Sequence, residues 1–257
     1  MTEPNATPRL TAMHHVPLHE RVYRELRDAI MTARLQPGEA VTLRGLAHEL
    51  GTSAMPIRDA VHRLVSVAAL EVLPNRTVRV PVLARERFSE LTQVRRVLEG
   101  AAAEAAATRL PLGEIAVLEN INRSMEAAIR RKDVRAVFRE NRAFHFAIYR
   151  SSANQLLVSM IEDLWLLCGP YLSLSWQARN EQKTLAGVVS EHHRELLRAL
   201  KRRDGAAAAT AVLADIEAAA MVVLRSPLFA QTQSVGRDAV APRRIARLGK
   251  HRASDGD

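Results

Sequence analysis

The segment from residue 43 to residue 65 constrains the fold most strongly, because it predicts two short helices joined by a turn. Apolar residues recur at helical spacing on both sides of Gly51, which ends the first helix where a positive φ is needed. Ser53 stands where an N-cap for the second helix is expected. This arrangement is typical of a helix-turn-helix, whose second helix offers its N-terminal half to a DNA major groove.

The composition favours a mostly α-helical protein with a soluble, cytoplasmic location. Hydrophobic residues make up 47% of the 257 residues and aromatic residues only 4%. The net charge of +9 agrees with a polyanionic partner, although a basic solvated surface explains it equally well. Cys168 is the single cysteine, so no internal disulfide forms, and its apolar neighbours predict a buried thiol. No signal peptide is evident, and uninterrupted apolar runs are shorter than a membrane span.

The N-terminal part of the chain is predicted to be a winged helix-turn-helix domain over residues 18–81. Residues 1–17 are polar and irregular and predict a disordered leader. An apolar stripe in residues 18–33 predicts a helix before the motif. After the motif, β-prone residues 70–73 and 78–81 flank a turn and predict the hairpin of a wing.

Beyond a short linker at residues 82–84, the pattern changes to long helices. Pro, Gly and Ser-Asn breaks delimit six helices with short connections, which predict an antiparallel helical bundle over residues 85–229. Residues 230–257 lose this periodicity and predict a flexible basic tail. The predicted helices cover approximately residues 85–109, 112–131, 133–151, 154–179, 184–203 and 205–225.

Strong polar residues interrupt the apolar stripes of four of these helices. They are Arg95, Asn141 with His145, His193, and Asp215. Each would cost roughly 1–3 kcal/mol if it were buried without a partner, so we expect them to meet one another, a metal ion or a ligand. Imidazole, carboxylate and amide groups together suit a divalent metal ion such as zinc, manganese or nickel. Arg95 suits the carboxylate of a small organic acid effector.

Other interpretations remain open from the residues alone. An inward His145 is also compatible with an ordinary hydrogen-bonded core residue. His192 lies about 100° round its helix from His193 and is expected at the rim. The pocket would also fit a metal-dependent enzyme acting on a small carboxylate, although no additional inward carboxylate offers a general base. A third alternative is a ligand-independent DNA-binding protein with a purely structural bundle.

The chain resembles the GntR family of bacterial transcription regulators, in particular the FadR-type branch with an all-helical effector-binding (FCD) domain. In the N-terminal part the resemblance rests on the segments LHERVYRELRDAI, LQPGE, LRGLAHELGTSAMPIRDAVHRL and VLPNRTVRV. In the C-terminal part it rests on VRRVLEGAAAEAAA, NRAFHFAIYRSSANQLL and SEHHRELLRALKRRDGAAAA. The order and spacing of these segments are more specific than any one of them.

This resemblance implies a ligand-responsive regulator that binds a pseudo-palindromic operator as a homodimer. The positions that carry over as DNA contacts are Arg44, Ser53, Ala54, Met55, Arg58, Asn75 and Arg76. Members usually have Arg where Ala54 stands, a small Thr at Met55 and Gly at Thr77. The operator is therefore expected to differ from the common half-site of the family.

The resemblance also implies a metal site in the bundle. Many members bind a metal through an Asp and a His four residues apart, together with two further His from the last two helices. Here these positions are Asn141, His145, His193 and Asp215. Asn is a neutral and weaker ligand than Asp, and Asp215 restores one negative charge from the opposite helix. In members without metal, polar pocket residues bind the effector directly.

Overall fold

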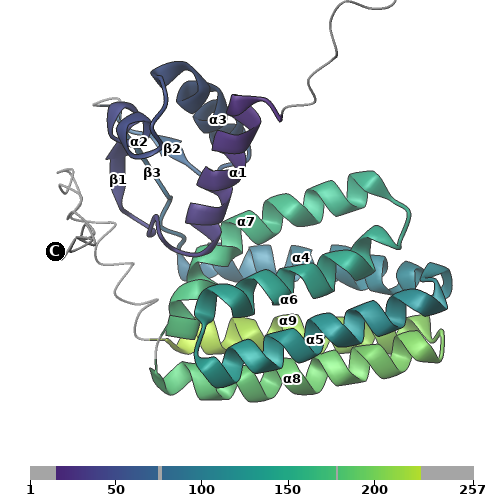
Figure 1. Cartoon of the computed structure of the whole chain (residues 1–257). Coiled ribbons are helices and arrows are strands. Elements are labelled where there is room, and N and C mark those ends of the chain that lie inside the picture. The colour runs from purple at the N-terminus through teal and green to yellow at the C-terminus, as the bar shows by residue number, and fades with distance from the viewer. Residues whose placement is uncertain (1–15, 75–76, 178, 227–257) are drawn as a thin grey trace, which may run out of the picture.

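The computed structural model describes residues 16–74, 77–177 and 179–226, and it shows a small N-terminal domain on a helical bundle (Figure 1). The N-terminal domain consists of α1 (Leu18–Met31), β1 (Ala40–Thr42), α2 (Leu43–Glu49), α3 (Ala54–Ser66), β2 (Glu71–Val72) and β3 (Thr77–Arg79). The bundle consists of α4 (Arg85–Arg109), α5 (Leu112–Arg131), α6 (Val134–Arg150), α7 (Gln155–Gln177), α8 (Arg179–Lys201) and α9 (Gly205–Arg225). The predicted fold class is confirmed.

The helices α2 and α3 form the predicted helix-turn-helix. Gly51 lies between them with φ +60°, which is the left-handed conformation that glycine adopts without steric cost. Ile57 and Leu64 of α3 are completely buried against the domain core. Ser53 occupies the predicted N-cap position of α3, although its side chain makes no capping hydrogen bond. The cap with a side-chain bond is at α2, where Thr42 Oγ1 accepts from the Gly45 N–H.

The wing belongs to a three-stranded antiparallel sheet with the order β1-β3-β2. The predicted hairpin is present as β2 and β3, with Val72 opposite Val78. The sequence analysis missed β1, in which Val41 pairs with Val78 on the other edge of β3. A three-residue strand has too few residues for a visible alternation, and this one exists because β3 offers it backbone partners.

The six bundle helices agree with the predicted ones, apart from shifts at their ends. The largest shift is at α8, which begins at Arg179 rather than near residue 184. Asp133 and Asp204 cap α6 and α9 by accepting backbone N–H bonds at 3.0 Å, which explains the breaks at these positions. Cys168 is fully buried, as predicted. The predicted leader before residue 16 and the predicted tail after residue 226 lie outside the described residues.

Two core helices, α7 and α9, are long and apolar enough to cross a membrane by length and composition alone. The expectation from the sequence considered only uninterrupted apolar runs, and it therefore did not identify these two helices. In the structure α9 packs between α4 and α8, and α7 packs against α1 and α4. Packing inside the bundle buries 44% of the apolar window of α7 and 39% of that of α9.

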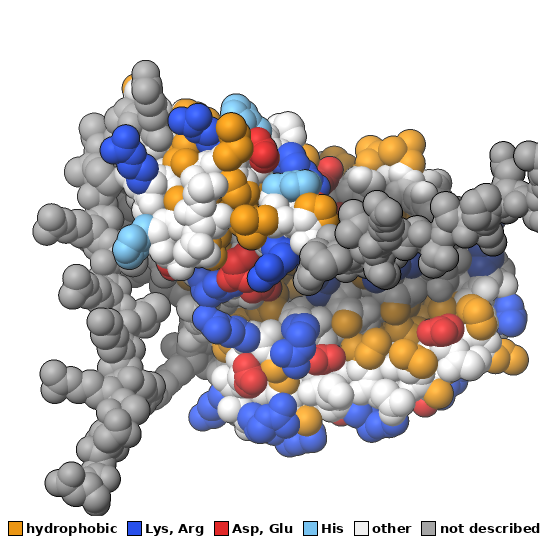
Figure 2. All heavy atoms as spheres, turned by 45° about the horizontal axis from the view of Figure 1, so that its top comes forward, with side chains coloured by type: hydrophobic (Ala, Val, Ile, Leu, Met, Phe, Trp, Pro, Cys, Tyr) orange, Lys and Arg blue, Asp and Glu red, His pale blue; other side chains and the backbone are white. Residues whose placement is uncertain are grey.

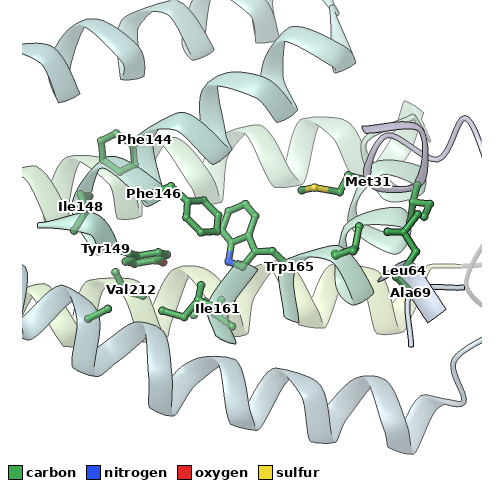
Figure 3. Close-up of a cluster of buried hydrophobic side chains, with 14 of the residues drawn as sticks. Met31, Leu64, Ala69, Phe144, Phe146, Ile148, Tyr149, Ile161, Trp165 and Val212 are labelled. Atoms are coloured by element: carbon green, nitrogen blue, oxygen red, sulfur yellow. The ribbon is translucent and has the colours of Figure 1, made fainter. Parts of the chain in front are cut away.

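The two domains share a continuous apolar core. Met31 of α1 and Leu64 of α3 belong to the same cluster of buried side chains as Trp165 of α7 (Figure 3). Gly169 lets α7 approach α1 closely, because a Cβ there would lie 3.3 Å from the Cα of Met31. The Tyr171 hydroxyl accepts from the Leu83 N–H at 2.6 Å, so α7 also holds the segment that links the domains.

We predict that Gly169→Val destabilises the protein, because the new side chain presses on the backbone of α1. Overpacking of this kind costs about 1–3 kcal/mol, which corresponds to several degrees in thermal midpoint. Gly187→Val in α8 is the matched control, since a Cβ there has nothing within 4 Å. Equal thermal midpoints for the two variants would contradict the close approach of α7 to α1.

Candidate functional site

Three of the polar residues predicted to point inward meet in the bundle. They are His145 of α6, His193 of α8 and Asp215 of α9, and all three are buried. The Nε2 atoms of the two histidines are 3.1 Å apart, and His145 Nε2 is 3.4 Å from Asp215 Oδ2. One ligand atom from each residue lies within 4.8 Å of the other two, a separation that suits a shared metal ion.

The outer nitrogen of each histidine has a partner that determines its protonation. His193 Nδ1 lies 3.0 Å from Asn122 Oδ1, which accepts, so this nitrogen carries the proton. The Tyr149 hydroxyl donates to Glu99 Oε2 at 2.6 Å, so it accepts from His145 Nδ1 at 3.1 Å. In a neutral imidazole the other nitrogen then has a free lone pair. Both Nε2 lone pairs therefore face the centre of the cluster.

The charges in the cluster favour a cation at its centre. Burial, reinforced by the nearby His145, lowers the pKa of His193 to about 3, so this imidazole is neutral near pH 7. For Asp215, burial opposes ionisation, but the contact with His145 outweighs it and the net pKa is lowered. The two Nε2 atoms and the Asp215 carboxylate oxygen thus converge on one point. This donor set fits a divalent transition metal ion.

Behind His145 a buried network surrounds Glu99, which is completely inaccessible to solvent. Its carboxylate accepts from Arg95 Nε at 2.6 Å, from Tyr149 and from the indole N–H of Trp165 at 2.9 Å. Figure 3 shows Tyr149 and Trp165 close together in the bundle core. The guanidinium that was predicted to receive an effector carboxylate is therefore already bound to a carboxylate of the protein.

A small cavity adjoins the cluster, and Arg95, Asn141 and Asp215 line it together with Trp165 and other apolar side chains. The Oδ1 atoms of Asn141 and Asp215 are buried, and neither has a hydrogen-bond partner among the described residues. The cavity offers about 30 Å³, which is enough for a water molecule. Two buried acceptors without a partner, on residues that line one cavity, indicate a place for a polar ligand or a metal-bound group.

The sequence analysis missed four residues that support this cluster: Glu99, Asn122, Tyr149 and Trp165. Two of them carried a usable signal, because Glu99 and Tyr149 follow Arg95 and His145 by four residues and share their helix faces. Asn122 belongs to α5 and Trp165 to α7, two helices that carry none of the predicted site residues. His192 is a rim residue as predicted, and its side chain contacts Glu195.

The predicted DNA-contacting residues of the helix-turn-helix lie on an exposed surface. Those that the structure describes are Arg44 in α2, Ser53 before α3, and Ala54, Met55 and Arg58 in the first turns of α3. Met55 is 64% exposed, which is unusual for a large apolar side chain. Asn75 and Arg76 lie outside the described residues. Arg79 in the wing is paired with Glu71.

Two protein families match the chain. Residues 18–80 match the family described as "Bacterial regulatory proteins, gntR family", and residues 90–218 match the FCD domain. These segments correspond to the winged helix domain and to most of the bundle.

Curated proteins and solved structures agree with these matches. The HTH-type transcriptional regulator McbR of Escherichia coli (strain K12) is 33% identical over 75% of this chain and 86% of its own length. The HTH-type transcriptional repressor RspR of the same organism is 23% identical over 74% of this chain and 81% of its own. The solved structure of E. coli McbR/YncC superposes with a TM-score of 0.74 at 31% identity, covering 79% of this chain and 95% of that one. A regulator from Rhodococcus sp. RHA1, at 22% identity and TM-score 0.66, has the same fold over 80% of this chain and 97% of its own.

We predict that Glu99→Gln lowers the free energy of unfolding by about 3–5 kcal/mol, because it leaves the Arg95 charge buried without a counter-charge. Urea denaturation measures this loss. The double variant Arg95→Met with Glu99→Gln should recover most of it, since no uncompensated charge remains.

Glu90→Gln is the control for this prediction. It breaks the exposed pair of Arg87 and Glu90 on the same helix and should change stability by less than about 1 kcal/mol. A loss of equal size for Glu90→Gln and Glu99→Gln would show that the buried network has no special role.

Proposed function

Because this chain belongs to the GntR family of bacterial regulatory proteins and has an FCD domain after its DNA-binding domain, we propose that its transcriptional control depends on a metal-containing pocket in the bundle. In this proposal a small organic acid binds in that pocket and changes the affinity of a homodimer for a pseudo-palindromic operator. The observation that carries it is the convergence of His145, His193 and Asp215 on one buried point. Such a regulator acts in the cytoplasm, where its operator lies.

Operator recognition is assigned to the exposed start of α3. Arg58 is exposed and makes no ion pair among the described residues, so its guanidinium is available to a base edge or a phosphate. Arg63, by contrast, bonds Glu20 at 2.8 Å and stacks on Tyr23, which attaches α3 to α1. Ala54 and Met55 replace the polar residues usual in the family, so this protein should prefer an operator that differs from the common half-site of the family.

The metal site is assigned to His145, His193 and Asp215, with Asn141 as a neutral neighbour. The convergence of the two Nε2 atoms on the Asp215 carboxylate and the lowered pKa values of His193 and Asp215 support this assignment, because metal ligands must be deprotonated. Tyr149 and Asn122 orient the two imidazoles from outside the site. A divalent ion such as zinc, manganese or nickel would supply positive charge for an acidic effector.

The effector is assigned to the adjoining cavity, whose positive charge would come from the metal ion, because the Arg95 charge is already compensated by Glu99. At about 30 Å³ the cavity is too small for an organic acid as it stands, so effector binding has to move its walls. Three of these wall residues, Trp165, Leu172 and Trp176, belong to α7. Since α7 packs on α1 and holds the interdomain segment through Tyr171, its movement would reach the DNA-binding domain.

In a homodimer this movement would change the separation of the two recognition helices. The two recognition helices must contact half-sites that lie about 34 Å apart, which is one helical turn of DNA. A small rotation of one subunit against the other therefore changes operator affinity strongly. A bundle with a purely structural role would instead leave operator affinity unchanged by any acid. Thermal-shift screening with candidate acids separates the two cases, since a pocket binder gains stability with its ligand.

We predict that Arg58→Ala weakens operator binding by about 5- to 100-fold, the loss expected for one guanidinium contact of about 1–3 kcal/mol. Gel-shift titration against the DNA upstream of its own gene, at a stated salt concentration, measures this loss. Arg198→Ala is the matched control, because it removes an equal charge from an exposed position on α8. Normal operator binding by Arg58→Ala would show that α3 is not the recognition helix.

We predict that His193→Ala releases the bound metal and abolishes the response to acids while operator binding persists. Mass spectrometry of the native protein measures the metal content. The neighbouring His192→Ala is the control and should retain the metal, since His192 points to the rim. Metal retained in His193→Ala, or absent from the wild-type protein, would refute the metal assignment.

A further inference from the structure

A second and larger cavity lies between the two domains. One wall is formed by Asp28 and Met31 of α1 and by Thr32, which follows this helix, and the other by α6. Its volume of about 440 Å³ lies in the range of pockets that hold small organic molecules. A neighbouring hollow of about 290 Å³ shares Thr32, Arg135 and Phe138 with it. We call this space the interdomain cleft.

The wall formed by α6 is strongly basic. Arg135, Arg139, Arg142 and Arg150 all line the cleft, at helical spacing on one face of α6. The opposite face of the same helix carries Asn141 and His145 toward the metal cluster. The cleft and the bundle pocket are therefore separate places on two sides of one helix, and Phe138 lies between them as part of both walls.

The positive charge of the cleft is only partly compensated. Arg139 is paired with Glu140 at 2.7 Å. Glu162 is shared, at 3.6 Å from Arg150 and 3.7 Å from Arg27. Asp28, the one acidic residue in the lining, is held by Arg34 at 2.6 Å. Arg142 is half-buried and has no carboxylate within ion-pair distance in the described part of the chain.

Arg142 lies near other positively charged side chains that disfavour its own charged form. Burial, together with the nearby Arg27 and Arg150, lowers the pKa of its guanidinium. The Nε of Arg27 is buried and has no hydrogen-bond partner among the described residues. Burying like charges side by side costs free energy that a bound anion would return. Figure 2 shows Lys and Arg side chains gathered where the N-terminal domain meets the bundle.

The floor of the cleft is apolar and aromatic. The guanidinium carbons of Arg142 and Arg150 each lie 5.6 Å from the centre of the Phe146 ring. Phe138 and Met31 complete this floor. A ligand with only charged groups would leave these surfaces unused, whereas one with a flat apolar part would cover them.

We propose that the interdomain cleft binds a small organic anion, with its phosphate or carboxylate groups on Arg135 and Arg142 and an aromatic part on Phe138. Guanidinium groups hold both kinds of anion through two parallel hydrogen bonds. The C-terminal segment of the chain is itself basic and does not suit this place. The ligand would touch α1 and α6 at once and so set the position of the DNA-binding domain on the bundle.

Calorimetric titration of the full chain with phenyl phosphate at low salt tests this proposal. We expect saturable binding, and at least fivefold weaker binding of inorganic phosphate, which lacks the ring. Arg142→Gln should weaken phenyl phosphate binding at least tenfold. Arg198→Gln, which removes an equal charge from α8, should change it less than twofold. Protein stripped of metal with a chelator should bind phenyl phosphate as well as untreated protein does.

Several results would overturn the proposal. One is the absence of saturable heat with phenyl phosphate, and another is equal weakening by Arg142→Gln and Arg198→Gln, which would indicate a general charge effect. Loss of binding after metal removal would assign the ligand to the bundle pocket instead. If Arg142→Gln weakened operator binding in a gel shift but left phenyl phosphate binding intact, the arginines would be DNA contacts. That last outcome would leave the proposed metal-dependent regulation untouched.

Discussion

Glu99 carries a negative charge in a part of the bundle that water does not reach. The groups that bond to its carboxylate come from three helices and hold these helices together. Arg95 supplies the counter-charge from the preceding turn of α4, while Tyr149 and Trp165 donate hydrogen bonds from α6 and α7. Removing one of these partners from the closed core would leave a buried group unpaired, which costs several kcal/mol when that partner is the counter-charge. The same network determines which nitrogen of His145 is protonated, so the chemistry of the metal cluster depends on the packing of the helices.

The helix α7 connects this network to the DNA-binding domain. On one side Trp165 and Trp176 line the cavity beside the metal cluster. On the other side Gly169 lies against α1, and Tyr171 holds Leu83 in the interdomain segment. Because the two domains share one apolar core, they cannot move independently without exposing buried surface. Ligands in the bundle pocket and in the interdomain cleft would act on the same junction from two sides.

Local patterns predicted most of the fold and part of the candidate site. Helix breaks were visible because Asp133 and Asp204 cap helices through their own neighbours in sequence. The convergence of His145, His193 and Asp215 was predicted from stripes on three helices together with a family resemblance. Features that depend on distant partners were not predicted: β1 forms only because β3 pairs with it, and Trp165 lies 66 residues from the Glu99 carboxylate it donates to.

The sequence by itself determined which side chains face inward, because helical periodicity is a local property of 3.6 residues per turn. It thereby determined that Arg95 and His193 would be buried and would need partners. Only the tertiary structure decided which partners they have. Arg95 is bound to Glu99 rather than free for an effector, and the buried Oδ1 atoms of Asn141 and Asp215, beside a cavity that both residues line, have no partner among the described residues. The physical reason is that hydrogen bonds are made over about 3 Å, and such distances between helices depend on the packing of the whole core.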